Sequence, residues 1–179
     1  MDALGEDAAE VELPAVAQHV VEMHQIVMDV EMARNLNREY EKSRDQLSGK
    51  LRELIERGRR HLAVDYRRAV DLIEPVNEAI DEVFNEYDAI LTPAAPGEAP
   101  VGLDSTGNPV FCTLWTYLGT PAVTLPLLAG PAGLPIGVQL VGRRGNDARL
   151  LRTARWLSAV LAGKRRGAKA TKAKKGKTP

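Results

Sequence analysis

Two runs of alternating hydrophobic residues, both inside the uncharged segment 105–142, form the clearest pattern in the chain. Alternation places every second side chain on the same face of a strand. The alternating residues are Val123, Leu125 and Leu127 in the first run and Ile136, Val138 and Leu140 in the second. Between the runs, Gly-Pro-Ala-Gly at 130–133 is a turn signal. We therefore predict a β-hairpin whose uncharged strands need cover on at least one face.

Upstream of this hairpin the pattern is mainly helical. Pro14 suits the first turn of a helix, where its missing N–H costs nothing. An apolar stripe at spacings of three and four then predicts a helix to about Asn35. The stripe consists of Val16, Val20, Met23, Val27 and Val30. Before Pro14, apolar and acidic residues alternate over 9–13, which predicts a short strand.

Two further helices are predicted in the charged middle of the chain. A polar helix spans about 37–57, and Gly58 is its expected C-terminal stop. A longer helical pattern spans about 62–87. Because the ring of Pro75 clashes with the preceding turn, this helix should kink or split near Asp71.

The remaining elements flank the hairpin. Residues 89–92 are typical of a short buried strand, and the Pro- and Gly-rich segment 94–109 of a loop. A short helix or turn is predicted over 110–118. After the hairpin, Asn146 can cap a last helix, and Gly163 is its expected end.

Several local motifs follow one another in a recognisable order. They are Tyr87-Asp-Ala-Ile-Leu-Thr-Pro93, then Gly119-Thr-Pro-Ala, then Leu134-Pro-Ile-Gly-Val-Gln-Leu-Val-Gly142, and then Asp147 with Leu150-Leu151. In these motifs the chain resembles the C-terminal part of the amidase signature family, whose enzymes hydrolyse or transfer carboxamides. The likeness extends from about residue 3 to 162, and the segment ending at Gly142 is its most specific part.

Pattern and resemblance together give the expected architecture. We expect an α/β fold with a mixed β-sheet covered by helices, as an incomplete C-terminal part of the amidase signature fold. The sheet should include 89–92, 121–128 and 135–142. Residues 1–162 should form the C-terminal part of an amidase domain. Residues 163–179 have no apolar periodicity and are expected to be a basic disordered tail.

The resemblance implies an acyl-enzyme mechanism that uses two serines and a lysine. One serine attacks the carboxamide carbon, and backbone N–H groups hold the oxyanion. In the family these groups lie upstream of the matched region, with the nucleophile in a Gly/Ser-rich loop. The serines of this chain lie in no such loop and are Ser43, Ser48, Ser105 and Ser158. Outside the tail, the lysines are Lys42 and Lys50, in a charged helical region. We therefore assign no catalytic residue and expect no activity from this chain alone.

Thr113, Trp115 and Thr116 are the candidate substrate-binding residues. The resemblance implies that this segment, just before Gly119, lies near the channel that admits the acyl part of the substrate. Trp115 would present an apolar wall and Thr116 a hydroxyl. The alternative, that Trp115 packs in the core, is favoured because buried aromatic residues are common. Gln139 points away from the face of its neighbours, and we expect it to have a structural hydrogen-bonding role.

No metal site or cofactor is expected. His19 and His24 are five residues apart, off one helical face, and His61 is remote, so all three are read as solvent-facing or capping residues. The acids of 1–90 lie beside arginines, as Glu53 does with Arg57, and are read as solvated pairs.

Charge and cysteine content limit the remaining classes. The net charge is zero, yet the tail carries eight basic residues, which leaves 1–162 with 16 basic against 24 acidic residues. A passive tail is favoured over nucleic-acid binding by counterion release, because the tail has no interleaved aromatic residues. The single cysteine, Cys112, excludes an internal disulfide. The acidic N-terminus lacks a signal-peptide pattern, and four prolines interrupt the uncharged segment, so we expect a cytoplasmic protein without a membrane span.

The expected function is therefore that of a C-terminal fragment of an amidase-like carboxamide hydrolase. A small-molecule amide is the expected ligand only if the catalytic half is supplied. One alternative is a non-catalytic subunit that completes a separate catalytic half, and another is a nucleic-acid-binding protein that acts through its basic tail. Exposed sheet edges should make the chain self-associate.

Overall fold

A computed structural model describes the backbone of residues 4–175 and the side chains of residues 4–163. The chain forms two compact units. The helical unit consists of Pro14–Val83 and Pro109–Gly119. The sheet unit consists of the described parts of Met1–Leu13, Phe84–Asn108 and Thr120–Pro179. Both units therefore combine stretches that are distant in the sequence.

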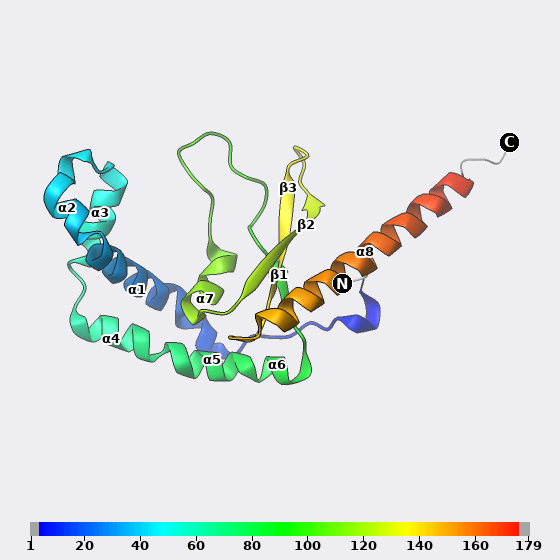
Figure 1. The fold of residues 1–179 in the computed structure, drawn as a ribbon, viewed down its shortest axis with the longest axis horizontal. Helices are drawn as coiled ribbons and strands as arrows, with labels where there is room; N and C mark the ends of the chain where they lie inside the picture. Colours follow the sequence, from blue (N-terminus) through cyan, green and yellow to red (C-terminus); the bar gives the residue numbers. More distant parts are fainter. Residues whose placement is uncertain (1–3, 176–179) are drawn as a thin grey trace. The chain divides into compact units, whose positions relative to one another are not determined.

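The helical unit is built around one long helix, α1, which packs against α3, α4 and α7 (Figure 1). Its elements are η2 (Ala15–His19), α1 (Val20–Asn35), α2 (Asn37–Ser43), η3 (Arg44–Gln46), α3 (Gly49–Gly58), α4 (Ala63–Asp71), α5 (Ile73–Asp81) and α7 (Val110–Leu118). The short helix α6 (Val83–Glu86) follows α5. The predicted ends of α1 at Asn35 and of α3 at Gly58 are confirmed, and so is the helix over 110–118.

The two longer predicted helices are divided. The polar helix over 37–57 breaks after α2 and η3, and Ser48 caps α3 by accepting a hydrogen bond from the N–H of Leu51 at 3.3 Å. A serine at this position favours a new helix start over continuation of the old one. The pattern over 62–87 becomes α4, α5 and α6, and its first break, at Leu72, lies beside the predicted position. Pro75 explains this break because it has no N–H to give to the preceding turn.

The sheet unit contains a three-stranded sheet in the order β1-β3-β2. Its strands are β1 (Ile90–Pro93), β2 (Ala122–Ala129) and β3 (Pro135–Val141), preceded by the turn η1 (Gly5–Asp7). The predicted hairpin and the strand near 89–92 are confirmed. Both pairings are antiparallel rather than mixed, as follows from a hairpin whose second strand also pairs with β1. The predicted strand over 9–13 does not form, because its alternating residues find no strand partner and Val11 and Leu13 are exposed.

Helix α8 (Asp147–Lys175) covers one face of the hairpin (Figure 1). Three of its residues, Leu150, Ala154 and Leu157, form a buried cluster with Leu140 of β3. The partly buried residues that pack against this cluster include all three of the alternating residues predicted for β2, namely Val123, Leu125 and Leu127. The α/β fold class, with helices on a sheet, is therefore confirmed.

The backbone of α8 continues through Gly163, where we expected the helix to end, and it is helical to Lys175 where we expected disorder. Alanine and lysine are strong helix formers, and this preference explains the continuation without an apolar stripe. The side chains of 164–179 and the backbone of 176–179 lie outside the described residues. The division of the chain at 162 stays a prediction.

Candidate functional site

The three predicted substrate-binding residues lie on α7 but differ in exposure. Thr113 and Trp115 are buried, at 7% and 4% exposure, while Thr116 is exposed. The hydroxyl of Thr113 donates to the carbonyl of Pro109 at 3.1 Å, one turn back on its own helix. Thr116 is therefore the one of the three whose side chain faces solvent in this chain. A buried Trp115 agrees with a packing role, and the substrate-binding role stays a prediction.

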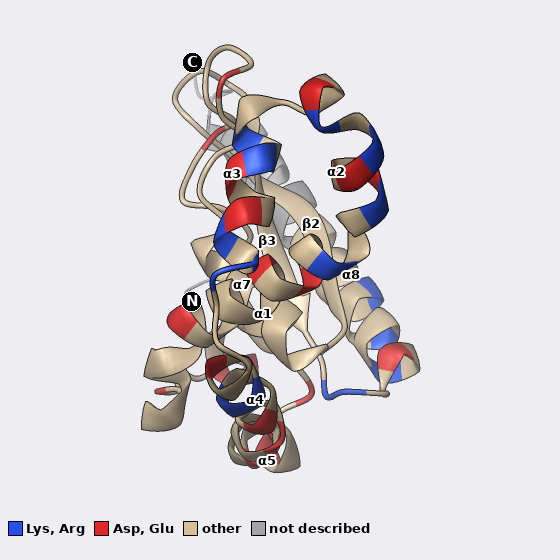
Figure 2. Ribbon diagram, turned by 90° about the vertical axis from the view of Figure 1, so that its left-hand side faces the viewer, with Lys and Arg blue, Asp and Glu red and all other residues tan. Residues whose placement is uncertain are grey.

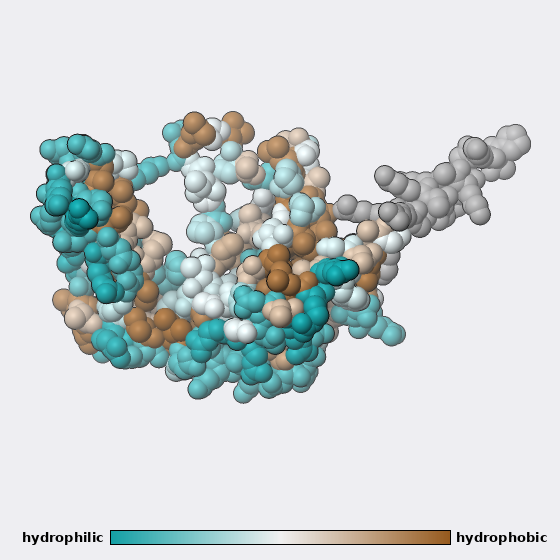
Figure 3. Space-filling view, viewed as in Figure 1, coloured by the Kyte–Doolittle hydropathy of each residue, from teal (hydrophilic) through white to brown (hydrophobic). Residues whose placement is uncertain are grey.

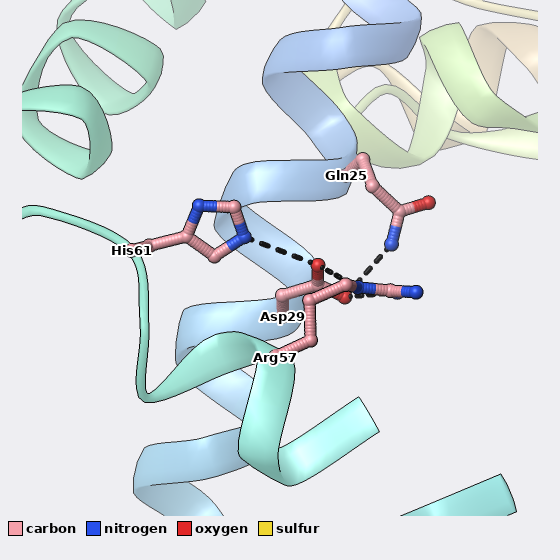
Figure 4. A network of polar contacts seen from close by, with 4 residues as sticks. All are labelled: Gln25, Asp29, Arg57 and His61. Carbon is pink, nitrogen blue, oxygen red and sulfur yellow. Dashed lines mark hydrogen bonds and ion pairs between the residues drawn. The ribbon is translucent and has the colours of Figure 1, made fainter. Parts of the chain in front are cut away.

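A second polar site, centred on Asp29 of α1, was not predicted (Figure 4). The Asp29 side chain is 1% exposed, and both of its oxygens accept hydrogen bonds. Arg57 of α3 donates from Nε to Oδ2 at 2.5 Å and from Nη2 to Oδ1 at 2.6 Å. Gln25 donates to Oδ1 at 2.7 Å, and His61 Nε2 lies 3.2 Å from Oδ2. The four side chains join α1, α3 and the segment that leads into α4.

This network corrects two expectations. Arg57 does not form a solvated pair with Glu53; its guanidinium binds Asp29 instead. His61 is not remote, because the turn after α3 carries it back to α1. Gln25, Asp29 and Ala33 recur every four residues, so they form a second buried face of α1 beside the apolar stripe. That spacing is the sequence signal that could have revealed the site.

Gly58 explains how α3 comes close enough to α1 to form this network. A Cβ atom at Gly58 would lie 2.0 Å from the backbone oxygen of Asp29 and 2.8 Å from the Cβ of Ala33. Any other residue would push the end of α3 away, and Arg57 with it. The same glycine thus ends α3 and permits the close packing.

The electrostatics of Asp29 suit a structural anchor. Burial acts to raise its pKa, but the hydrogen bonds from Arg57, His61 and Gln25 together outweigh burial and hold the pKa below its usual value. The hydrogen bond with Asp29 raises the pKa of Arg57. A general base needs a free lone pair toward its substrate, whereas both Asp29 oxygens are already engaged by donors. The site therefore fastens helices rather than supplying a proton acceptor.

Other charged residues of the helical unit match the expectation of solvated pairs. Acidic and basic residues intermix on α2, α3 and α4 (Figure 2). Exposed pairs include Arg59 with Glu41 at 2.6 Å and Arg67 with Asp71 at 2.6 Å. Such pairs are screened by water and contribute little to stability.

In the sheet unit, Gln139 has the structural role predicted for it. Its side chain is buried and donates from Nε2 to the hydroxyl of Thr92 at 2.9 Å and to the carbonyl of Pro93 at 3.2 Å. These bonds tie β3 to β1 at a residue pair of the sheet, Thr92 with Gln139. The side chain therefore reinforces the strand register.

Glu98, in the loop before α7, fastens the hairpin turn. Its carboxylate accepts the N–H of Ala132 at 3.1 Å and that of Leu134 at 2.8 Å. Its side chain also occupies the space beside Gly130, where a Cβ atom would lie 2.2 Å from Glu98 Cγ. The loop and the turn therefore hold each other in place.

A cleft in the sheet unit is lined by none of these residues. Asp88 and Arg149, on its wall, form an ion pair. The full lining is Phe84, Tyr87, Asp88, Gly142, Arg143, Asn146 and Arg149. Among the described residues, no group of three or more His, Cys, Asp or Glu side chains is placed to hold a metal ion.

Comparison with known proteins places these elements in a family. The family model described as Amidase matches residues 1–151. The chain belongs to the amidase family. Among curated proteins, this amidase-family chain is similar to a subunit of the glutamyl-tRNA(Gln) amidotransferase of Chloroflexus aggregans, at 39% identity over 95 residues. It is also similar to the subunit of the same name from Agathobacter rectalis, at 33% identity over 96 residues.

These matches cover half of this chain and a much smaller share of the relatives. The Chloroflexus match spans 49% of this chain and 19% of the relative, and the Agathobacter match spans 50% and 19%. The chain therefore spans about a fifth of the length of these curated relatives.

Solved structures support the fold. A crystal structure described as an amidase shares 27% identity and a TM-score of 0.71, covering 83% of this chain and 37% of that chain. A 6-aminohexanoate cyclic dimer hydrolase has a TM-score of 0.73 at 21% identity, covering 89% of this chain and 39% of its own. The second likeness shows the fold alone. No helix within the described range combines the length and the apolar character needed to cross a membrane.

Proposed function

We propose that this chain is the C-terminal scaffold part of an amidase-like carboxamide hydrolase. In this proposal it contributes the β2–β3 hairpin with α8 and one wall of the substrate channel. The nucleophilic serine, the bridging serine and the lysine come from a catalytic part that is not among these 179 residues. The supporting observation is the family match over 1–151, by a chain that spans about a fifth of its curated relatives.

The side chains present support this division of labour. Ser48 caps α3 through its hydroxyl, and the hydroxyl of Ser158 donates to the carbonyl of Ala154 at 2.9 Å inside α8. Ser105 accepts the N–H of Gly107 at 3.1 Å in an exposed loop. A serine nucleophile needs an adjacent base that removes its proton, and these hydroxyls are occupied by local backbone bonds instead.

Assaying the purified chain against a panel of carboxamides tests the first half of the proposal. We expect no turnover above that of buffer. Turnover that survives replacement of Ser43, Ser48, Ser105 and Ser158 by alanine would show that this chain carries chemistry of a different kind.

The substrate wall is tested in the presence of a catalytic part. In this proposal Thr116 offers its hydroxyl to the amide, and Trp115 backs it as an apolar surface. Thr116→Val removes the hydroxyl and keeps the volume, so it should raise KM several-fold and leave kcat close to the original value. Equal kinetics for Thr116→Val and the original chain would remove Thr116 from the wall.

A second candidate function is a non-catalytic subunit that completes a separate catalytic half. It is favoured by the relatives in Chloroflexus aggregans and Agathobacter rectalis, which are themselves named as amidotransferase subunits. Mixing this chain with a separately purified catalytic half of an amidase should then restore amide hydrolysis. Failure to restore it under conditions where both parts are folded would favour a scaffold that works only within one polypeptide.

A further inference from the structure

The seat of α7 in the helical unit is a break in the helices beneath it. Helix α4 ends at Asp71, α5 begins at Ile73, and Pro75 has no N–H for the turn before it. The last carbonyls of a helix have no partner within that helix. Ala69, whose side chain is fully buried, supplies one of these carbonyls, and the hydroxyl of Tyr117 on α7 donates to it. The break thus provides an acceptor that an unbroken helix would have used itself.

Asn77 supplies a second anchor from α5. Its Nδ2 donates to the carbonyl of Ile73 at 3.1 Å and to the carbonyl of Leu118, the last residue of α7, at 3.1 Å. The residue is 2% exposed. Its Oδ1 accepts no hydrogen bond from the described residues. The amide is therefore used as a double donor, and turning it over would set an oxygen against two carbonyl oxygens.

Together these contacts fix α7 at its C-terminal end. Tyr117 and Leu118 are adjacent, and one donates to α4 while the other accepts from α5. Two bonds to different helices prevent α7 from rotating about its own axis. Leu118, at 1% exposure, then faces inward, and Thr116 faces solvent.

We propose that Asn77 and Tyr117 are positioning residues, which set the rotation of α7 and thereby make Thr116 the side chain that it presents to a substrate. The proposal rests on the proposed function, in which α7 forms a wall of the amide channel. It assigns Asn77 and Tyr117 a role beyond packing, because each acts through a polar atom on the backbone of another helix.

Hydrogen exchange of the full chain tests the positioning role without any substrate. Tyr117→Phe removes only the hydroxyl, and Asn77→Asp replaces a donor by an acceptor at nearly constant volume. Each should speed exchange of the 110–119 amides about fivefold or more, the factor expected for the loss of one ordinary hydrogen bond. Exchange in α1 and α3 should stay unchanged. Asn85→Asp, the same chemical change at an exposed position, is the matched control and should leave α7 as it is.

Fluorescence gives an independent readout. In a Trp156→Phe background, Trp115 is the remaining tryptophan, and its emission should shift to the red in both variants as α7 loosens. Unchanged α7 exchange would overturn the proposal. So would a uniform rise through the helical unit, or unfolding of Tyr117→Phe, because either result would mean that these side chains support the core as a whole. If the chain fails to complete an amidase but α7 responds as expected, the proposed function fails and the positioning role stands.

Discussion

Replacing Asp29 by asparagine tests the buried network most directly. The change keeps the shape of the side chain, removes its charge and turns one acceptor into a donor that faces Arg57 or His61. Hydrogen bonds to charged groups contribute about 1.5–3 kcal/mol each. Breaking a buried pair costs about 3–5 kcal/mol when the remaining charge stays buried. Here the remaining charge is Arg57, whose side chain is 44% exposed and can turn to water. We therefore expect a loss of about 2 kcal/mol.

The assay is reversible urea or thermal unfolding of the full chain. For a protein of this size, a loss of about 2 kcal/mol lowers Tm by roughly 4–8 °C. Asp45→Asn is the matched control, since Asp45 is exposed in η3, and it should change stability by no more than about 0.5 kcal/mol. Arg57→Gln should cost more than Asp29→Asn, because it leaves the buried carboxylate without its guanidinium. The reasoning is refuted if Asp29→Asn is as stable as the control.

The same network predicts a pH dependence. The folded pKa of Asp29 lies below its usual value, so between the folded and unfolded pKa values the unfolded chain binds more protons. The stabilisation is therefore complete above the unfolded pKa of about 3.9 and is lost as the pH falls through the folded pKa. In Asp29→Asn this part of the acid destabilisation should disappear. An unchanged acid limb in the variant would mean that other carboxylates control it.

Three further changes test other parts of the structure. Gly58→Ala should destabilise the chain by about 2 kcal/mol or more in urea unfolding, since its Cβ would overlap the backbone of α1, whereas Gly49→Ala, with open space around it, should not. Glu98→Ala removes the acceptor for two turn amides and should speed their hydrogen exchange about fivefold, with no change at α3. Among the described strands β2 is an outer one, uncharged, and hydrophobic side chains gather over the hairpin (Figure 3). Leu128→Lys, at a half-exposed position on β2, should therefore reduce self-association in sedimentation velocity, and equal association would exclude this edge.

The parts of the fold that the sequence predicts well depend on local order. The hairpin follows from alternation around Gly-Pro-Ala-Gly, and the break near Asp71 follows from Pro75, because both signals act within a few residues. The strand over 9–13 was wrong because alternation makes a strand only where a partner strand is available. The division after η3 was missed, although Ser48 is a preferred helix cap.

The polar contacts were harder to predict because their partners are far apart in the sequence. Asp29 lies 28 residues from Arg57 and 32 from His61, and Glu98 lies 34 residues from Ala132. Such pairs depend on where helices end and chains turn back, which periodicity does not give. On α7 the sequence indicated the correct helix, but which of its side chains are buried depends on packing against α1 and α5.

The interleaved make-up of the two units has a practical consequence for dissecting this chain. The stretch Pro109–Gly119 belongs to the helical unit, while the sequence on both sides of it belongs to the sheet unit. No single cut in the polypeptide can therefore release either unit intact. A deletion series would remove part of each at once, so isolating one unit requires a permuted gene in which its pieces are joined by new linkers.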